Sequence, residues 1–159
     1  IAAGNEWVAA QTAPDPLGAA LMVRGEVIQQ LGGLDDGYFM YCEELDWAVR
    51  MKLAGWQLYA VPTARITHHE GQSSKQVRWS AFARLWRSRL RFYRKYQGNH
   101  PVGYLNAVRL LVAIGLRWRL WQVDRRFAKG QINGIVWQEE RNAYRDVLRM
   151  ALTNYNNPL

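Results

Sequence analysis

The feature that most constrains the fold is a change of pattern near Ser73-Ser74. After it, large apolar side chains recur at steps of three and four: Trp79, Phe82, Trp86, Leu90 and Tyr93. A second stripe, of arginines, occupies another helix face: Arg84, Arg87, Arg91 and Arg94. This period is that of an α-helix. Further helices are expected over about 104–128 and 134–151, after a glycine-containing break at 98–101. The sequence therefore predicts a helical region over residues 75–159.

The first part of the chain has shorter patterns. The apolar run 17–23 is typical of a buried strand, and residues 26–31 are expected to form a short helix that ends at Gly32-Gly33. An amphipathic helix is expected over 43–54, followed by two short strands within 56–67. These patterns predict an α/β fold for residues 17–70, within a first domain of residues 1–74.

The charged residues are distributed unevenly between the two parts of the chain. Residues 1–74 hold four Lys or Arg and nine Asp or Glu, a net charge of −5, whereas residues 75–159 hold 17 and four, a net charge of +13. An acidic first half suits a metal or sugar site, and a basic second half suits phosphates of lipid, nucleotide or nucleic acid. The single cysteine, Cys42, is typical of a reducing compartment, and no signal peptide is visible, so a cytoplasmic location is expected.

Three carboxylates, those of Glu43, Glu44 and Asp46, crowd the expected start of the helix over 43–54. One interpretation is structural, because acidic side chains are favourable at a helix N-terminus and Asp46 can pair with Arg50. The other is catalytic, because mutual repulsion raises a carboxyl pKa toward the range of a general base. Side chains at i and i+2 diverge on a helix, so Glu44 and Asp46 are not expected to share one metal.

A histidine pair, His68 and His69, lies near the expected end of a strand. Neighbouring strand residues point to opposite faces, so one of the two is expected to reach a site. Its imidazole could complete the coordination of Mn²⁺ or Mg²⁺ beside phosphate oxygens, although a histidine at a strand end is often structural. Zinc is poorly supported, because the chain lacks a spaced set of His and Cys.

Several of these residues together resemble a known family. The order and spacing of several short motifs are similar to those in the second half of family 2 glycosyltransferases. These motifs are Gly18-Ala19, Gly32-Gly33-Leu34-Asp35-Asp36, Glu43-Glu44-x-Asp46-Trp47 with Arg50, Gly55-Trp56 and His68-x-x-Gly71-x-Ser73. The resemblance covers roughly residues 17–97. It implies an inverting transferase with a GT-A fold, of which residues 17–70 would be the C-terminal part of the mixed sheet.

The resemblance also implies roles for individual residues. Glu44 would be the catalytic base, in a place where the family usually has Asp, and Glu43 would stand beside it. Asp46 would orient the site through Arg50, and His68 would bind the metal, Mn²⁺ or Mg²⁺. The residues implied in donor or acceptor binding are Gly18, Ala19, Gly33, Asp35, Asp36 and Trp47. The substrates would be a nucleotide-sugar donor and a glycan or lipid-linked acceptor.

One departure from the family is large. Its members begin with a nucleotide-binding half that carries an Asp-x-Asp motif, and no Asp-x-Asp occurs in the 159 residues. The chain is therefore expected to be a C-terminal part that has no transferase activity alone. A non-catalytic interaction module of the same fold is the alternative.

The basic half leaves two interpretations open. The apolar run 110–116, flanked by Arg109 and by Trp118 and Trp121, is too short to span a bilayer. It suits either a helix lying on an anionic membrane surface, on the inner face of the membrane, or a buried helix–helix contact. A basic nucleic-acid-binding module is compatible with the arginines, but no recognised motif supports it, so no nucleic acid is expected. Exposed aromatic surface would also favour a homodimer.

Overall fold

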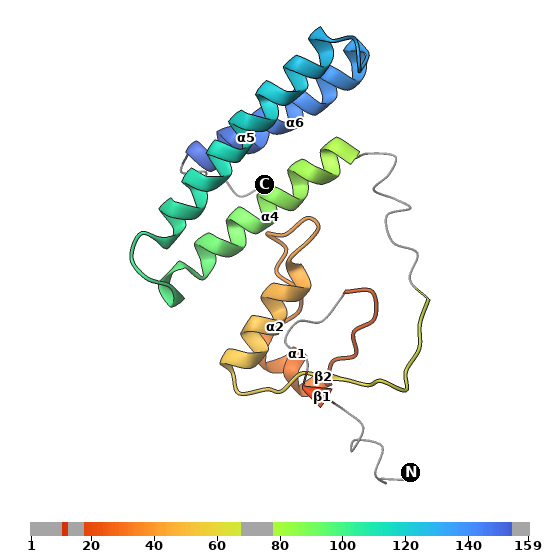
Figure 1. Cartoon of the computed structure of the whole chain (residues 1–159). Coiled ribbons are helices and arrows are strands. Elements are labelled where there is room, and N and C mark those ends of the chain that lie inside the picture. Colours follow the sequence, from red (N-terminus) through yellow and green to blue (C-terminus); the bar gives the residue numbers. More distant parts are fainter. Residues whose placement is uncertain (1–10, 13–17, 68–77, 154–159) are drawn as a thin grey trace. The chain divides into compact units, whose positions relative to one another are not determined.

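The structure is a computed structural model that describes residues 11–12, 18–67 and 78–153. Its internal contacts divide the chain into two compact units. The first comprises residues 1–38 and 42–70, and the second comprises residues 39–41 and 71–159. Figure 1 labels the helices and strands of both units.

The first unit contains two helices around a small apolar core. α1 (Gly25–Leu31) and α2 (Glu43–Leu53) confirm the expected helices to within one residue at each end. Gly32, at φ +72°, follows α1 in the left-handed region that glycine adopts without strain. The buried side chains of this core come from both helices: Val27, Trp47 and Met51. This packing fixes which face of α2 is turned away from the core.

The α/β prediction for residues 17–70 is wrong. The part of the chain that the structure describes is mostly helical, and its strands are β1 (Gln11–Thr12) and β2 (Tyr59–Ala60), which pair antiparallel. Met22, in the run expected to be a buried strand, is 98% exposed. A strand obtains its hydrogen bonds from neighbouring strands, and among the described residues none pairs with this run. An apolar run alone does not create those neighbours.

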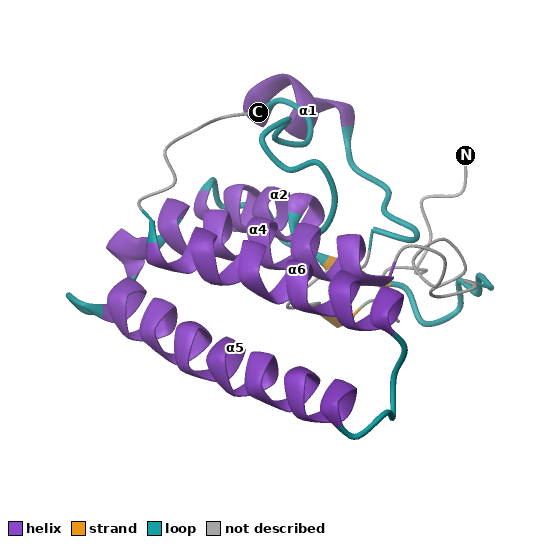
Figure 2. Cartoon of the chain, turned by 90° about the horizontal axis from the view of Figure 1, so that it is seen from above, coloured by secondary structure: helices purple, strands orange, loops and turns teal. Residues whose placement is uncertain are grey.

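The second unit is built from three long helices, as its sequence period predicts. They are α4 (Arg78–Lys95), α5 (Tyr104–Ala128) and α6 (Gly134–Leu152), with a short 3₁₀ turn, η2 (Gln97–Asn99), between α4 and α5. The Asn133 side chain caps α6 by accepting a hydrogen bond from Val136 N at 2.9 Å. Figure 2 shows α5 at the edge of this unit. No helix in the described ranges is long and apolar enough to cross a membrane.

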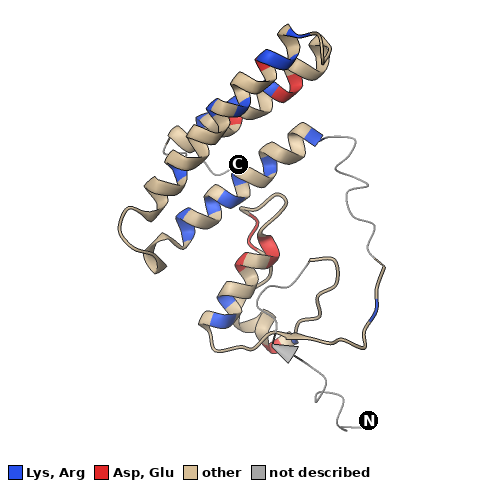
Figure 3. Ribbon diagram, in the orientation of Figure 1, with Lys and Arg blue, Asp and Glu red and all other residues tan. Residues whose placement is uncertain are grey.

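The three helices of the second unit share one core. Its most deeply buried side chains come from α5 and α6: Leu116, Val123, Tyr144 and Val147. Three residues of the α4 stripe, Trp79, Phe82 and Trp86, pack against them, so this part of the stripe faces the core. Trp79 and Phe82 meet the ring of Tyr144 edge to face, at centroid distances of 5.7 and 5.4 Å. Figure 3 shows Lys and Arg along all three helices.

A buried polar group accompanies this core. The Tyr144 hydroxyl donates a 2.8 Å hydrogen bond to the carboxylate of Glu140, which also pairs with Arg126 at 3.1 Å. Glu140 is almost completely buried. Burial, followed by the hydrogen bond to Glu140 and the charge of Glu140, raises the pKa of Tyr144 to about 12. Glu140 thus connects Tyr144, on the same helix, with Arg126 of α5, and the hydroxyl of Tyr144 can donate this bond only while it keeps its proton.

Replacing Val147 by alanine is expected to destabilise the second unit. The change removes two methyl groups from a site with no solvent exposure, which costs roughly 2–3 kcal/mol of unfolding free energy. Leu110→Ala, at a position 60% exposed on α5, should cost about 0.5 kcal/mol or less. Urea unfolding followed by circular dichroism measures both. Equal losses for the two variants would contradict the core described above.

The stability of the chain is expected to fall in alkaline solution partly through Tyr144. Its pKa is about 12 in the folded chain and about 10 when unfolded. The stabilisation is therefore fully present below pH 10 and is lost as the pH rises to about 12. Wild type should lose unfolding free energy more steeply than Tyr144→Phe over this interval in urea titrations. Parallel pH profiles would show that another group is responsible.

Candidate active site

The acidic cluster follows an unusual bend of the backbone. Tyr41 and Cys42 have φ angles of 68° and 65°, in the left-handed region. Residues other than glycine seldom adopt it, at a cost of about 1–2 kcal/mol each. Cys42 precedes α2 and makes no side-chain capping bond. The bend of the main chain therefore sets the direction in which the first turn of α2 leaves the loop.

Asp46, in the first turn of α2, is completely buried. Arg50 Nε donates to Asp46 Oδ2 at 2.9 Å, and the Tyr38 hydroxyl donates to Oδ1 at 3.3 Å. A buried carboxylate needs such donors, because an unpaired one costs several kcal/mol. Asp46 is thus enclosed by protein, and its carboxylate holds the side chains of Arg50 and Tyr38 in place.

Arg50 and Trp47 fasten α2 to the end of α1. Arg50 donates from its two terminal nitrogens to the carbonyl oxygens of Leu31 and Gly33, each at 2.7 Å. The Trp47 indole N–H donates to the carbonyl of Gly32 at 3.0 Å. Carbonyls at a helix C-terminus have no partner within the helix, so these three donors satisfy consecutive acceptors. The glycine pair is held against α2 as a result.

Glu43 and Glu44 differ from Asp46 in their surroundings. Both are half-buried, and one oxygen of each, Oε2, is buried without a hydrogen-bond partner in the described part of the chain. Burial raises the pKa of Glu43, and the charge of Glu44 raises it further, while a backbone hydrogen bond opposes both. The sequence predicts a raised carboxyl pKa in this cluster, and the structure assigns it to Glu43.

Gly18 lies against the side chain of Glu44. An ideal Cβ built on Gly18 would stand 3.6 Å from the Glu44 carboxyl carbon and 3.7 Å from its Cγ. These are van der Waals distances, so the Gly18 backbone borders the carboxyl group directly. Two residues 26 positions apart, both singled out from the sequence, are thereby brought together within the first unit.

The other residues predicted to bind donor or acceptor have diverse surroundings. Ala19 and Asp36 are exposed. Asp35 Oδ1 accepts a 2.8 Å hydrogen bond from Gly37 N and so shapes the loop before α2. Trp47 is 8% exposed and belongs to the core, where its packing and its hydrogen bond to Gly32 account for a tryptophan. Their roles toward a sugar or nucleotide stay predictions.

The predicted metal ligand, His68, lies outside the described residues, as do His69, Gly71 and Ser73. Within the described ranges, no three side chains of His, Cys, Asp or Glu are grouped as a metal site requires. The carboxylates at the start of α2 therefore do not make a metal site by themselves. Binding of Mn²⁺ or Mg²⁺ stays a prediction.

The sequence did not reveal that Tyr38 contacts the acidic cluster through Asp46. The sequence context of Tyr38 indicates only an aromatic anchor in a loop. In the structure its ring is buried and its hydroxyl binds Asp46. A side chain eight residues ahead of its acceptor gives no periodic signal, so the loop conformation alone produces the contact.

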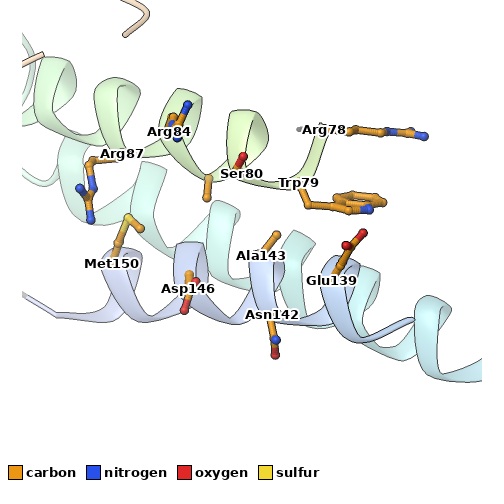
Figure 4. Close-up of a pocket in the computed structure, with 11 residues that line it drawn as sticks. Arg78, Trp79, Ser80, Arg84, Arg87, Glu139, Asn142, Ala143, Asp146 and Met150 are labelled. Carbon is orange, nitrogen blue, oxygen red and sulfur yellow. The ribbon is translucent and has the colours of Figure 1, made fainter. Parts of the chain in front are cut away.

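The second unit has a groove of its own between α4 and α6, with a volume of about 610 Å³. In Figure 4, Glu139 of α6 points toward Trp79 of α4, and the groove is lined by side chains of both signs of charge. Two of its arginines contact aromatic rings: Arg78 lies over Trp79 and Arg84 over Phe39, each at 5.0 Å. The mixed charges that line this groove do not indicate a particular class of ligand.

Comparisons with known proteins relate part of the chain to glycosyltransferases. The chain is 40% identical over 81 residues to the rhamnosyltransferase WbbL of Escherichia coli, covering 46% of this chain and 31% of that protein. It is 42% identical over 57 residues to the N-acetylglucosaminyl-diphospho-decaprenol L-rhamnosyltransferase of Mycobacterium tuberculosis, covering 36% of this chain and 19% of that protein. The chain thus spans a third or less of these relatives. No family model and no solved structure matches it.

Replacing Asp46 by asparagine is expected to loosen the start of α2. The change removes the charge that holds Arg50 in a buried pair, which costs about 3 kcal/mol locally. Asp146→Asn is the matched control, because Asp146 forms an exposed pair with Arg149 at 3.3 Å, worth less than about 1 kcal/mol. Amide hydrogen exchange of α2 and α6 measures the two effects. Unchanged protection of α2 in Asp46→Asn would contradict the role given to this pair.

Proposed function

We propose that this chain is part of a glycosyltransferase that moves a sugar from a nucleoside-diphosphate sugar to an acceptor hydroxyl, with inversion at the anomeric carbon. The observation that carries the proposal is the 40% identity over 81 residues to a rhamnosyltransferase. It is supported by the acidic start of α2, where Glu44 lies beside Gly18 and carries a buried oxygen without a partner among the described residues.

The proposed reaction is a direct displacement. The acceptor oxygen attacks the anomeric carbon while the bond from that carbon to the diphosphate oxygen breaks. The bonding electrons leave with the nucleoside diphosphate, and the acceptor proton passes to a carboxylate. We assign this base to Glu44, whose unpartnered oxygen can accept a proton. Asp46 and Arg50 would position the helix turn that carries it.

Glu43 is the alternative base. Its raised pKa brings this carboxyl closer to the range in which a general base works best. The family resemblance favours Glu44, and the electrostatics favour Glu43. A glutamate at the base position is one methylene longer than the aspartate usual in the family, so the acceptor would sit correspondingly further from the backbone.

The relatives suggest the substrate class. Both are rhamnosyltransferases by name, and the mycobacterial one is named for a diphosphate-linked lipid acceptor. We propose a nucleotide-linked rhamnose as the donor and a lipid-diphosphate-linked sugar as the acceptor. Residues that bind the nucleotide would be supplied by the rest of a longer protein, and we expect the 159 residues alone to give no turnover. No step is assigned to a metal, since the described residues do not build its site.

Glu44→Gln is expected to lower kcat by a factor of about 10²–10⁴. The assay is nucleotide release from a panel of nucleoside-diphosphate sugars, using the longest natural chain that contains these residues. Glu26→Gln is the matched control, since Glu26 is an exposed carboxylate in the first turn of α1. Glu43→Gln, made in parallel, tests the alternative base.

Each outcome is decisive for one assignment. Loss of turnover in Glu44→Gln alone supports Glu44, and loss in Glu43→Gln alone moves the base to Glu43. Turnover that survives both changes removes the base from this cluster. No turnover by wild type with any donor, in the presence of a lipid-linked acceptor, favours a non-catalytic interaction module.

A further inference from the structure

The side of α5 that faces away from the core is apolar although it is exposed. Five large apolar side chains on it are between 46% and 68% exposed: Leu110, Leu111, Ile114, Trp118 and Trp121. Leu111, at one edge of this set, also borders a groove lined by Phe82 and Trp86 of α4. At the helical repeat they all lie within about 60° of Ile114 around the axis. We call these five residues the outer face of α5. On the opposite side, Leu116 and Val123 enter the core. A helix that is apolar on both sides has a second surface to cover.

Cations accompany the outer face. Arg117, Arg125 and Lys129 lie within the same arc of about 60° on either side of Ile114. The Arg125 guanidinium lies 4.7 Å from the centroid of Trp121. Trp121 in turn stacks on Trp118 at 4.7 Å. Aromatic rings and guanidinium groups thus form one continuous surface.

Carboxylates are absent from this arc. The sequence of α5 contains one, Asp124. It lies at the side of the helix and accepts hydrogen bonds from the Trp137 indole at 2.8 Å and from Arg141 at 3.0 Å. Its charge is therefore compensated by α6, and the outer face keeps a net positive charge.

We infer that the outer face of α5 binds the surface of an anionic lipid bilayer. Tryptophan rings suit the boundary between headgroups and acyl chains, where the apolar ring is buried and the indole N–H stays hydrated. Arginine and lysine extend from such a boundary to lipid phosphates. Leucine and isoleucine supply the area that enters the acyl region. The inference rests on α5 alone and does not depend on transferase activity.

The geometry favours a helix that lies in the plane of the surface. Arginines interrupt α5 along its length, and no described helix is apolar enough to span a bilayer. The core side of α5 is held by α6, partly through a 2.6 Å hydrogen bond from Arg109 Nε to the carbonyl of Ala151. Burying the core side against α6 leaves the outer face as the surface available to lipid.

A second copy of the chain is a poorer match for this face. Two outer faces packed on each other would bring Arg117, Arg125 and Lys129 against their own copies, with no carboxylate in the arc to neutralise them. Like charges brought together in an interface oppose association. An anionic bilayer surface supplies the missing negative charge without a specific partner geometry.

The test is sedimentation of the 159-residue chain with vesicles. Wild type should pellet with phosphatidylcholine vesicles that contain about one third phosphatidylglycerol at low salt, and at least tenfold less at about 0.5 M salt. Pure phosphatidylcholine should retain much less protein. Failure to pellet with the anionic vesicles would overturn the inference.

Two pairs of variants assign binding to the outer face. Ile114→Gln with Trp118→Gln should weaken vesicle binding at least tenfold, whereas Ile135→Gln, at a position 72% exposed on α6, should not change it. Arg117→Gln with Arg125→Gln should also weaken it at least tenfold, compared with Arg145→Gln on the exposed side of α6. Far-UV circular dichroism checks that each variant keeps its helices.

Two results would overturn the assignment. Equal binding by the outer-face variants and their controls would remove the outer face from any membrane contact. A concentration-dependent dimer in analytical ultracentrifugation, lost in the Ile114→Gln, Trp118→Gln variant, would show that a second copy covers the face. Vesicle binding that falls only in the outer-face variants supports the inference.

Discussion

The ion pair between Asp46 and Arg50 is the interaction on which the first unit depends. Asp46 has no solvent exposure, and its charge is tolerable because donors such as Arg50 and Tyr38 meet it. The same guanidinium spans the gap to two main-chain carbonyls at the end of α1. One side chain thus satisfies a buried charge and two unpaired acceptors. Glu43 and Glu44 lie in the same first turn of α2 as Asp46.

The second unit depends on a different constraint, which is the two-sided character of α5. Its inner side completes a core with α4 and α6. Its outer side would be unfavourable in water if nothing covered it. The sequence allows two interpretations of the apolar run 110–116, a helix on a membrane surface or a buried helix–helix contact, and in the structure only part of the run is buried. Val112, Ala113 and Leu116 are buried or half-buried, while Leu110, Leu111 and Ile114 are exposed.

The helices could be predicted from sequence because their signal is local. The stripe that begins at Trp79 predicts a helix, and Gly32 predicts the end of α1. Each prediction uses only residues close together in the sequence, and the structure agrees with both. The α/β fold could not be predicted correctly, because a strand is defined by partners distant in sequence. The run 17–23 has the composition of a strand, but its described residues have no neighbouring strand.

The residues of the candidate site could be predicted from the sequence, but the contacts between them could not. Glu43, Glu44, Asp46 and Gly18 were identified from their order, but the contact of Gly18 with Glu44 follows from the path of the chain. The raised pKa belongs to Glu43 chiefly because of burial, a property that residue spacing does not contain. The hydroxyl of Tyr38 reaches Asp46 from a loop that has no period.

The left-handed backbone of Tyr41 and Cys42 affects both the stability of the protein and the orientation of the acidic side chains that follow. Glycine at either position would relieve the backbone and, in this respect, make the native conformation easier to hold. It would also let the bend swing through angles that bulkier residues forbid. Glycine at these two positions would therefore favour stability, whereas the bulkier residues present favour a fixed direction for the start of α2.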